Sequence, residues 1–286
     1  PPRSTLFPYT TLFRSVYADI DPDTFNLEPE SLQQAITART RAIIIQHTYG
    51  LPAPVDRLLK IAAERGIPVI EDACHAFGTR YQGRELGTFG VGAFFSSQWS
   101  KPITTGLGGW AVVNDPALRQ KVEAFTQRWP APSLKIQLLI LLQYLAHRAL
   151  FKPWLYFRLR QLYRWLSSAR LTVGSSTAQE LSSLMPADYL QTMGPVQRRI
   201  LSGKLSTSNR TRAHRQILTH MIQGFLKADF GQALRVEAEV GDLSMLCVPV
   251  RVKDKEQLLA RAVAARLEVW DWFLSPVHPC LSGWEA

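Results

Sequence analysis

RAIIIQHTYGLPAPVDRLLKIAAERGIPVIEDA, residues 41–73, has the pattern of a strand, a helix and a second strand. The runs at residues 43–45 and 67–70 are apolar and rich in β-branched residues, as in buried strands of a parallel sheet. Between them, apolar residues recur at helical spacing from Val55 onward, and Gly66 follows where a helix would end. Two buried strands joined by a helix predict a parallel sheet with a right-handed crossover.

The alternation continues on both sides of this unit. VYADID (residues 16–21) predicts a short strand, and residues 28–36 predict a helix that begins with acidic residues. Two further strands are expected at GAFFSS (residues 92–97) and GWAVVN (residues 109–114). The expected fold class is therefore α/β, with a mostly parallel sheet and flanking helices.

A different pattern begins after residue 114. Residues 133–170 predict two basic amphipathic helices that are split near Pro153. The tail is then expected to form a long helix, a strand and another helix, at residues 196–226, 245–252 and 255–269. This order predicts a second, smaller α+β domain at the C-terminal end.

Positive charge is concentrated in one segment of the chain. The net charge is +10, yet no acidic residue lies between Glu123 and Glu180, where eight Lys and Arg residues are found. Nucleic-acid binding would have to rest on this segment alone, and we do not expect it. Aromatic residues among the arginines also fit a helix at a membrane surface, beside the simpler interpretation as an ordinary packed insertion.

Cysteine usage indicates the compartment. Cys74, Cys247 and Cys280 are too few and too scattered for a disulfide framework or a zinc cluster. No stretch reaches the roughly eighteen apolar residues that a membrane-spanning helix needs. We therefore expect a cytoplasmic protein without a bound metal, whose basic helices can also place it at a membrane surface.

The first residues predict no structural element. Residues 5–15, TLFPYTTLFRS, match the translation of a common sequencing adapter, and regular structure is expected only from Val16 onward. We therefore assign residues 1–15 to the adapter and expect the chain to be a fragment. The expected organisation is a partial large domain, a basic helical insertion and a partial small domain, at residues 16–125, 126–180 and 181–286.

One lysine lies in unusually apolar surroundings. In FFSSQWSKPITTGLGGWAVV, residues 94–113, Lys101 is the only charged residue. Burial lowers the pKa of a lysine, and a lysine that reacts with an aldehyde must spend time as a neutral amine. Asp72 ends a buried strand, where a carboxylate is costly unless a cation meets it. A protonated pyridine ring would be such a cation, and Ser96 is placed to bind a phosphate.

Each of these residues has a simpler interpretation when it is taken alone. A lysine beside a glycine-rich turn is usually a surface residue, and an aspartate at a strand end often caps a helix. The turn TTGLGGW fits neither the dinucleotide-binding nor the Walker motif. The hypothesis of a cofactor site rests on the conjunction, because Asp72, Ser96 and Lys101 follow the ends of successive strands, where reactive groups gather in α/β sheets.

Residues 21–118, from DPDTF to NDPAL, resemble the DegT/DnrJ/EryC1/StrS aminotransferases, through motifs that include VIEDA and FFSSQWSK. The resemblance implies a fold-type I enzyme that depends on pyridoxal phosphate. It implies that Lys101 binds the cofactor covalently, that Asp72 pairs with the ring nitrogen, and that Ser96 is a phosphate ligand.

The resemblance also concerns two histidines. His75 stands where the family usually has Gln, beside the cofactor's phenolic oxygen, and an imidazole can donate there in one of its tautomers. His47 matches a frequent histidine of the family and either lines the pocket as a cofactor contact or merely closes its strand. Leu107 departs from the family, which usually has Glu in the glycine turn.

The presence of lysine at residue 101 implies the reaction class, because related members that dehydrate a sugar carry His there. The resemblance implies transfer of an amino group from glutamate to a keto group of a nucleotide-linked sugar, by a homodimer. Lys101 would move the proton as general acid and base. Two alternatives remain open. One is another fold-type I enzyme, such as a lyase or desulfurase, and the other is a catalytically silent relative that binds a membrane or a partner through its basic helices.

Overall fold

The computed structural model describes residues 15–150, 189–230 and 243–269, together with Lys152, Leu155 and Leu159. The chain forms two compact units, which are described separately. One contains residues Ala18–Tyr144 and Gln191–Pro249, and the other contains Pro1–Tyr17, Leu145–Leu190 and Val250–Ala286. The organisation expected from the sequence, with boundaries at residues 125 and 180, stays a prediction.

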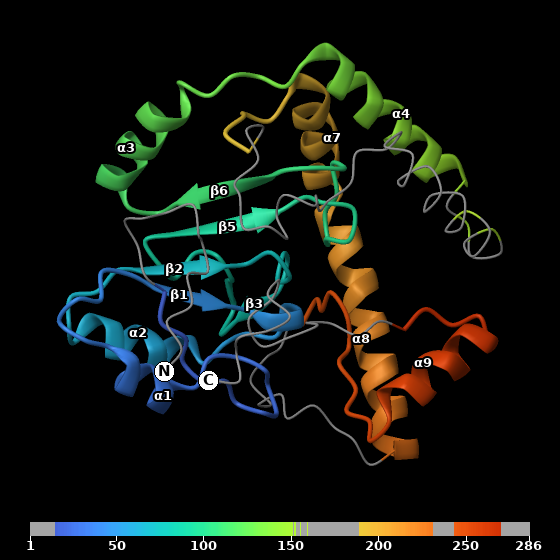
Figure 1. The fold of residues 1–286 in the computed structure, drawn as a ribbon, viewed down its shortest axis with the longest axis horizontal. Coiled ribbons are helices and arrows are strands. Elements are labelled where there is room, and N and C mark those ends of the chain that lie inside the picture. Colours follow the sequence, from blue (N-terminus) through green and yellow to red (C-terminus); the bar gives the residue numbers. More distant parts are fainter. Residues whose placement is uncertain are drawn as a thin grey trace. The chain divides into compact units, whose positions relative to one another are not determined.

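A four-stranded sheet forms the centre of the first unit (Figure 1). Its strands are, in spatial order, β1 (Ile43–Gln46), β2 (Val69–Asp72), β5 (Gly92–Ser96) and β6 (Gly109–Val113). β1, β2 and β5 are parallel, which confirms the mostly parallel α/β sheet. β6 runs antiparallel to β5, because no helix lies between them to carry the crossover that a parallel return requires.

Helices α1 (Pro29–Ala35) and α2 (Val55–Ala63) pack on one face of β1 and β2. Their apolar side chains form a cluster with those of the strands: Leu32, Leu58, Ala62, Ile43, Ile45 and Val69. Ile44 points to the opposite face and is 50% exposed. The apolar run of β1 is therefore buried on one face only, although the sequence predicted a fully buried strand. Gly66 follows α2 with φ of 61°, as the sequence indicated.

Two expected strands are absent from the structure, and one hairpin was not expected. Residues 16–21 form no strand, and only an isolated bridge joins Ile20 to Leu27. Residues 245–252 form no strand either. A short hairpin of β3 (Arg80–Tyr81) and β4 (Arg84–Glu85) was not predicted, because two-residue strands are too short to show a period.

The long helix expected at residues 196–226 is two helices, α7 (Pro195–Ser206) and α8 (Ser208–Phe230). Thr207 separates them with a φ of −108°. Its hydroxyl donates to the carbonyls of Gly203 and Lys204. Such local side-chain bonds compete with the helical backbone, which explains why the helix is interrupted here.

Three more helices are described. α3 (Pro116–Thr126) begins after Asp115, whose carboxylate caps it by accepting the Leu118 N–H. α4 (Leu134–Leu150) is the first of the two expected basic helices, whereas the second falls largely outside the described residues. α9 (Lys255–Ala264) confirms the last expected helix. Among the helices described, none is both long and apolar enough to cross a membrane.

Candidate active site at the carboxyl edge of the sheet

Lys101 lies in the loop of residues 97–108 that joins β5 to β6. Its N–H donates to the carbonyl of Gln98 at 3.1 Å. The loop returns to the sheet through Gly106 and Gly108, whose φ values of 93° and 94° strain any residue with a side chain. The glycine-rich turn is therefore a requirement of the backbone at this place.

The loop is fixed from within and from helix α7. Ser97 Oγ and Thr105 Oγ1 form a buried hydrogen bond of 2.8 Å across the loop. Gln197 of α7 donates from Nε2 to the carbonyl of Leu107 at 2.6 Å. Because the backbone of Leu107 makes this contact, the departure from the family's usual Glu does not affect it.

The Lys101 amine contacts His75. The distance from Lys101 Nζ to His75 Nε2 is 3.0 Å. The pKa of Lys101 is lowered by burial. Cys74, Asp72 and Cys247 raise it when they are ionised, without cancelling the effect of burial. The structure thus brings together three of the residues singled out from the sequence, Lys101, Asp72 and His75.

His75 is an uncharged imidazole. It follows β2 and is only 4% exposed. Burial, with the neighbouring Lys101 as a second cause, lowers the pKa of His75 to about 3. The ring therefore stays neutral through the physiological range and cannot contribute a positive charge to the site.

Asp72 and Ser96 end the neighbouring strands β2 and β5. Asp72 Oδ1 accepts the Cys74 N–H at 3.0 Å, which holds the carboxylate at the edge of the sheet. Ser96 Oγ accepts the Gln98 N–H at 3.4 Å. Burial and the adjacent Asp72 raise the pKa of the Cys74 thiol, so it remains protonated and is a poor nucleophile.

His47 is directed into a different cluster. Its Nε2 lies 3.1 Å from Glu71 Oε2, and its Nδ1 accepts the Ala53 N–H at 3.1 Å. The side chain is fully buried. Because the protein occupies both ring nitrogens, these bonds favour the strand-closing interpretation, and a cofactor contact by His47 stays a prediction.

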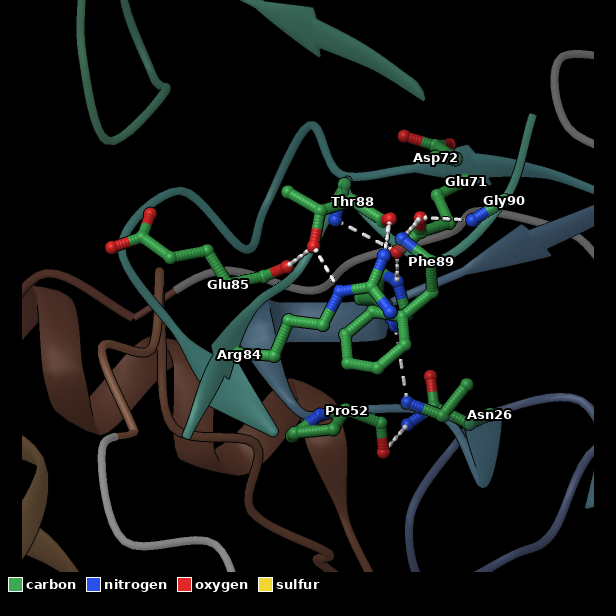
Figure 2. Close-up of polar contacts among 12 residues, drawn as sticks. Asn26, Pro52, Glu71, Asp72, Arg84, Glu85, Thr88, Phe89 and Gly90 are labelled. Carbon is green, nitrogen blue, oxygen red and sulfur yellow. Dashed lines mark hydrogen bonds and ion pairs between the residues drawn. The ribbon is translucent and has the colours of Figure 1, made fainter. Parts of the chain in front are cut away.

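Glu71 is the buried carboxylate that the sequence analysis did not single out. It accepts backbone N–H groups from Gly87, Phe89 and Gly90 at 2.7, 2.6 and 2.8 Å, in addition to the bond with His47 (Figure 2). Alternation along β2 places Glu71 and Asp72 on opposite faces, and Figure 2 shows their side chains pointing apart. The period of two in VIEDA could have separated the two acids, since Glu71 shares a face with the buried Val69.

A distant segment completes the edge of the site. The Leu246 N–H donates to the Tyr49 carbonyl at 2.8 Å, and Arg215 Nη1 donates to the Met245 carbonyl at 3.1 Å. Cys247, the residue after Leu246, is close enough to Lys101 for its thiolate form to act on the pKa of the lysine. No local pattern in the sequence indicates this contact, because it joins residues about 200 positions apart.

Gly50→Ala tests how tightly this segment packs. A Cβ at residue 50 would lie 2.9 Å from Met245 Cα and 3.0 Å from the His75 carbonyl, at a φ of 93°. We expect a loss of roughly 2–4 kcal/mol in the free energy of unfolding, measured in urea. Gly83→Ala is the matched control, since φ is 75° there but nothing lies within 4 Å of the added carbon. Equal losses in the two variants would contradict the close packing.

Comparison with known proteins identifies this region. A model described as the DegT/DnrJ/EryC1/StrS aminotransferase family matches residues 11–128. An L-glutamine:2-deoxy-scyllo-inosose aminotransferase of Streptomyces kanamyceticus is 44% identical over 108 residues, which are 38% of this chain and 25% of that protein. An L-glutamine:scyllo-inosose aminotransferase of Streptomyces griseus is also 44% identical over 108 residues, or 38% of this chain and 26% of the relative.

The match is partial in length. This chain spans about a quarter of the curated relatives that it matches. The crystal structure of a DegT DnrJ EryC1 StrS aminotransferase from Brucella abortus aligns with 93% of this chain and 60% of that chain, with a TM-score of 0.66 and 19% identity, which shows the shared fold. Residues 11–128 therefore resemble the DegT/DnrJ/EryC1/StrS aminotransferase family, and the chain shares the fold of one of its members.

Proposed function

We propose that the protein transfers an amino group from an amino-acid donor to the keto group of a sugar or cyclitol, with pyridoxal phosphate as its cofactor. The observation that carries the proposal is the Lys101 amine, which burial shifts toward its neutral form and which contacts His75 at 3.0 Å. A neutral amine is what an aldehyde-bearing cofactor requires of the lysine that holds it.

The residues around Lys101 fit such a cofactor chemically. Lys101 would bind the aldehyde carbon of the cofactor. Asp72, whose charge acts on Lys101 and which therefore lies near it, would keep the ring nitrogen protonated. Ser96, at the end of β5, would bind the phosphate, and His75 would donate to the phenolic oxygen. This division of roles gives each of these four residues one contact with a different part of the cofactor.

The bound cofactor would supply an electron sink for the carbon that loses its proton. Lys101 would move that proton as general base and acid. Burial lowers the pKa of Lys101 and so favours the uncharged amine, which is the form that can accept a proton. Asp72, at the end of β2, would pair with the ring nitrogen and hold its proton in place.

The relatives inform the choice of substrates. The names of the two Streptomyces relatives give L-glutamine as donor and an inosose, a keto cyclitol, as acceptor. The family resemblance had implied glutamate and a nucleotide-linked sugar. Both pairs combine an α-amino acid with a keto group on a polyhydroxylated ring, so the proposal is made at that level. It includes a cytoplasmic homodimer as the working form.

The test is a complete turnover assay. The full chain is incubated with pyridoxal phosphate, L-glutamine or L-glutamate, and scyllo-inosose or a nucleotide-linked keto sugar. We expect the amino product of the acceptor and an equal amount of the 2-oxo acid from the donor, both measured by mass spectrometry. Failure to form either product with every pair would overturn the proposal. Release of sulfide from L-cysteine instead would indicate a desulfurase, and absence of cofactor binding would indicate a silent relative.

A further inference from the structure

We infer that the backbone N–H of Tyr49 fixes the ring proton of His75 on Nε2, and that His75 thereby holds Lys101 as an uncharged amine. The inference concerns the same site and rests on the proposed function only for its catalytic consequence. The charge state of Lys101 itself can be measured without the cofactor.

The first step concerns the tautomer of His75. The Tyr49 N–H donates to His75 Nδ1 at 3.3 Å. A backbone N–H can only donate, so Nδ1 must present its lone pair and carry no hydrogen. The ring is neutral, because burial, the main cause of its lowered pKa, acts whatever the charge of Lys101. A neutral imidazole with a bare Nδ1 carries its hydrogen on Nε2.

The second step concerns the partner of Nε2. Lys101 Nζ lies 3.0 Å away, which is hydrogen-bond distance. An ammonium group has three donors and no acceptor, so it would direct hydrogen toward the hydrogen of Nε2. A neutral amine instead offers a lone pair that accepts from Nε2–H. The contact is therefore satisfied only by the uncharged form of Lys101.

The third step explains why the Tyr49 N–H points at His75. Tyr49 has a φ of 59° and Gly50 one of 93°, so two successive residues adopt the left-handed region. This conformation is costly for Tyr49, and it persists where neighbouring contacts hold it. The Thr48 N–H donates to Asn26 Oδ1 at 2.8 Å, and the Leu246 N–H donates to the Tyr49 carbonyl at 2.8 Å.

The charges around Lys101 favour its ammonium form only weakly, because the two nearby thiols are protonated near neutral pH. Asp72 favours the ammonium form. Cys247 contributes no negative charge near neutral pH, since burial raises the pKa of its thiol to about 11, and the pKa of Cys74 is raised further by burial and Asp72. Burial and the oriented Nε2–H of His75 favour the uncharged amine of Lys101, whereas the charge of Asp72 favours its ammonium form.

The consequence distinguishes His75 from the glutamine that is usual at this position in the family. An amide can rotate to present its oxygen and accept from an ammonium group, whereas the locked imidazole cannot. The protein would therefore offer a reactive amine before any cofactor arrives, without first transferring a proton to solvent.

The test measures the pKa of Lys101 in the cofactor-free full chain. Trace acetylation with acetic anhydride is carried out over a range of pH, and the peptide that contains Lys101 is quantified by mass spectrometry. We expect its midpoint at least about one pKa unit, or tenfold in acidity, below that of the exposed lysines. His75→Gln should raise the midpoint toward the ordinary range. His214→Gln, on the exposed side of α8, should leave it unchanged.

A second measurement requires no stable variant at the site. The ¹⁵N shifts of the wild-type histidine rings report which nitrogen carries hydrogen, and we expect His75 to be bare at Nδ1 and protonated at Nε2. Hydrogen on Nδ1, or an ordinary midpoint for Lys101, would overturn the inference. Failure to bind pyridoxal phosphate by a chain with a low Lys101 midpoint would instead refute the proposed function and leave the inference standing.

Discussion

Replacing Lys101 with Ala is expected to lower kcat for amino transfer by a factor on the order of 10⁴, the upper range for loss of a positioned general acid and base. The substitution also removes the atom that would bind the cofactor covalently. The side chain is only part-buried, so the fold should tolerate its truncation. Turnover is measured with saturating donor and acceptor, and attachment is measured by reductive trapping of the cofactor on the Lys101 peptide.

The matched control is Lys121→Ala, which removes an exposed lysine from α3. It should keep both kcat and the trapped cofactor at wild-type levels. Near-normal turnover by the Lys101 variant would mean that the chemistry takes place at another group. Trapping on a different lysine would relocate the site without refuting an aminotransferase activity.

Replacing Glu71 with Ala is expected to have the largest effect on folding, about 3–5 kcal/mol in the free energy of unfolding. The carboxylate is fully buried and accepts three backbone N–H groups as well as the His47 ring. Its removal leaves these donors without an acceptor in a site that excludes water. Urea unfolding followed by circular dichroism measures the loss.

Glu85→Ala provides the comparison, because the Glu85 side chain is 48% exposed and forms ion pairs with Arg80 and Arg212. Such a pair contributes less than about 1 kcal/mol.

The pH dependence of stability provides a second test of Glu71. Burial alone would raise the pKa of Glu71, but the hydrogen bonds from His47, Gly90 and Gly87 lower it by more. The folded-state pKa of Glu71 therefore lies below 4.5.

The Glu71 stabilisation is thus complete above the unfolded-state pKa of about 4.5 and is lost as the pH falls through the lower folded-state value. The wild type should lose stability more steeply than Glu71→Ala in this acid range. Identical slopes for the two proteins would show that the carboxylate is not held as described.

The strand ends were the most predictable part of the site. The apolar runs located β2 and β5. Because Asp72 and Ser96 end these strands and Lys101 follows β5, all three were expected at the carboxyl edge of the sheet. The direction of β6 was not predictable from composition, because GWAVVN has the same pattern in either orientation. The direction was determined by the lack of a helix between the strands.

Contacts between distant residues set the limit of sequence reasoning. The expected strand at residues 245–252 is instead an irregular segment whose backbone bonds to Tyr49 and Arg215. The left-handed conformation of Tyr49 gives no signal in the sequence, since tyrosine rarely adopts it. The geometry that surrounds His75 therefore emerged only from the folded chain.

The donor that orients the His75 ring belongs to the main chain, and this has an evolutionary consequence. Any amino acid except proline supplies an N–H at position 49, so point substitutions of Tyr49 would change the stability of the turn while preserving the orientation of the imidazole. Substitutions at position 49 are therefore expected to leave the reactivity of Lys101 unchanged. Insertions or deletions between β1 and α2 would change the shape of the loop, and with it the orientation of the His75 ring and the reactivity of Lys101.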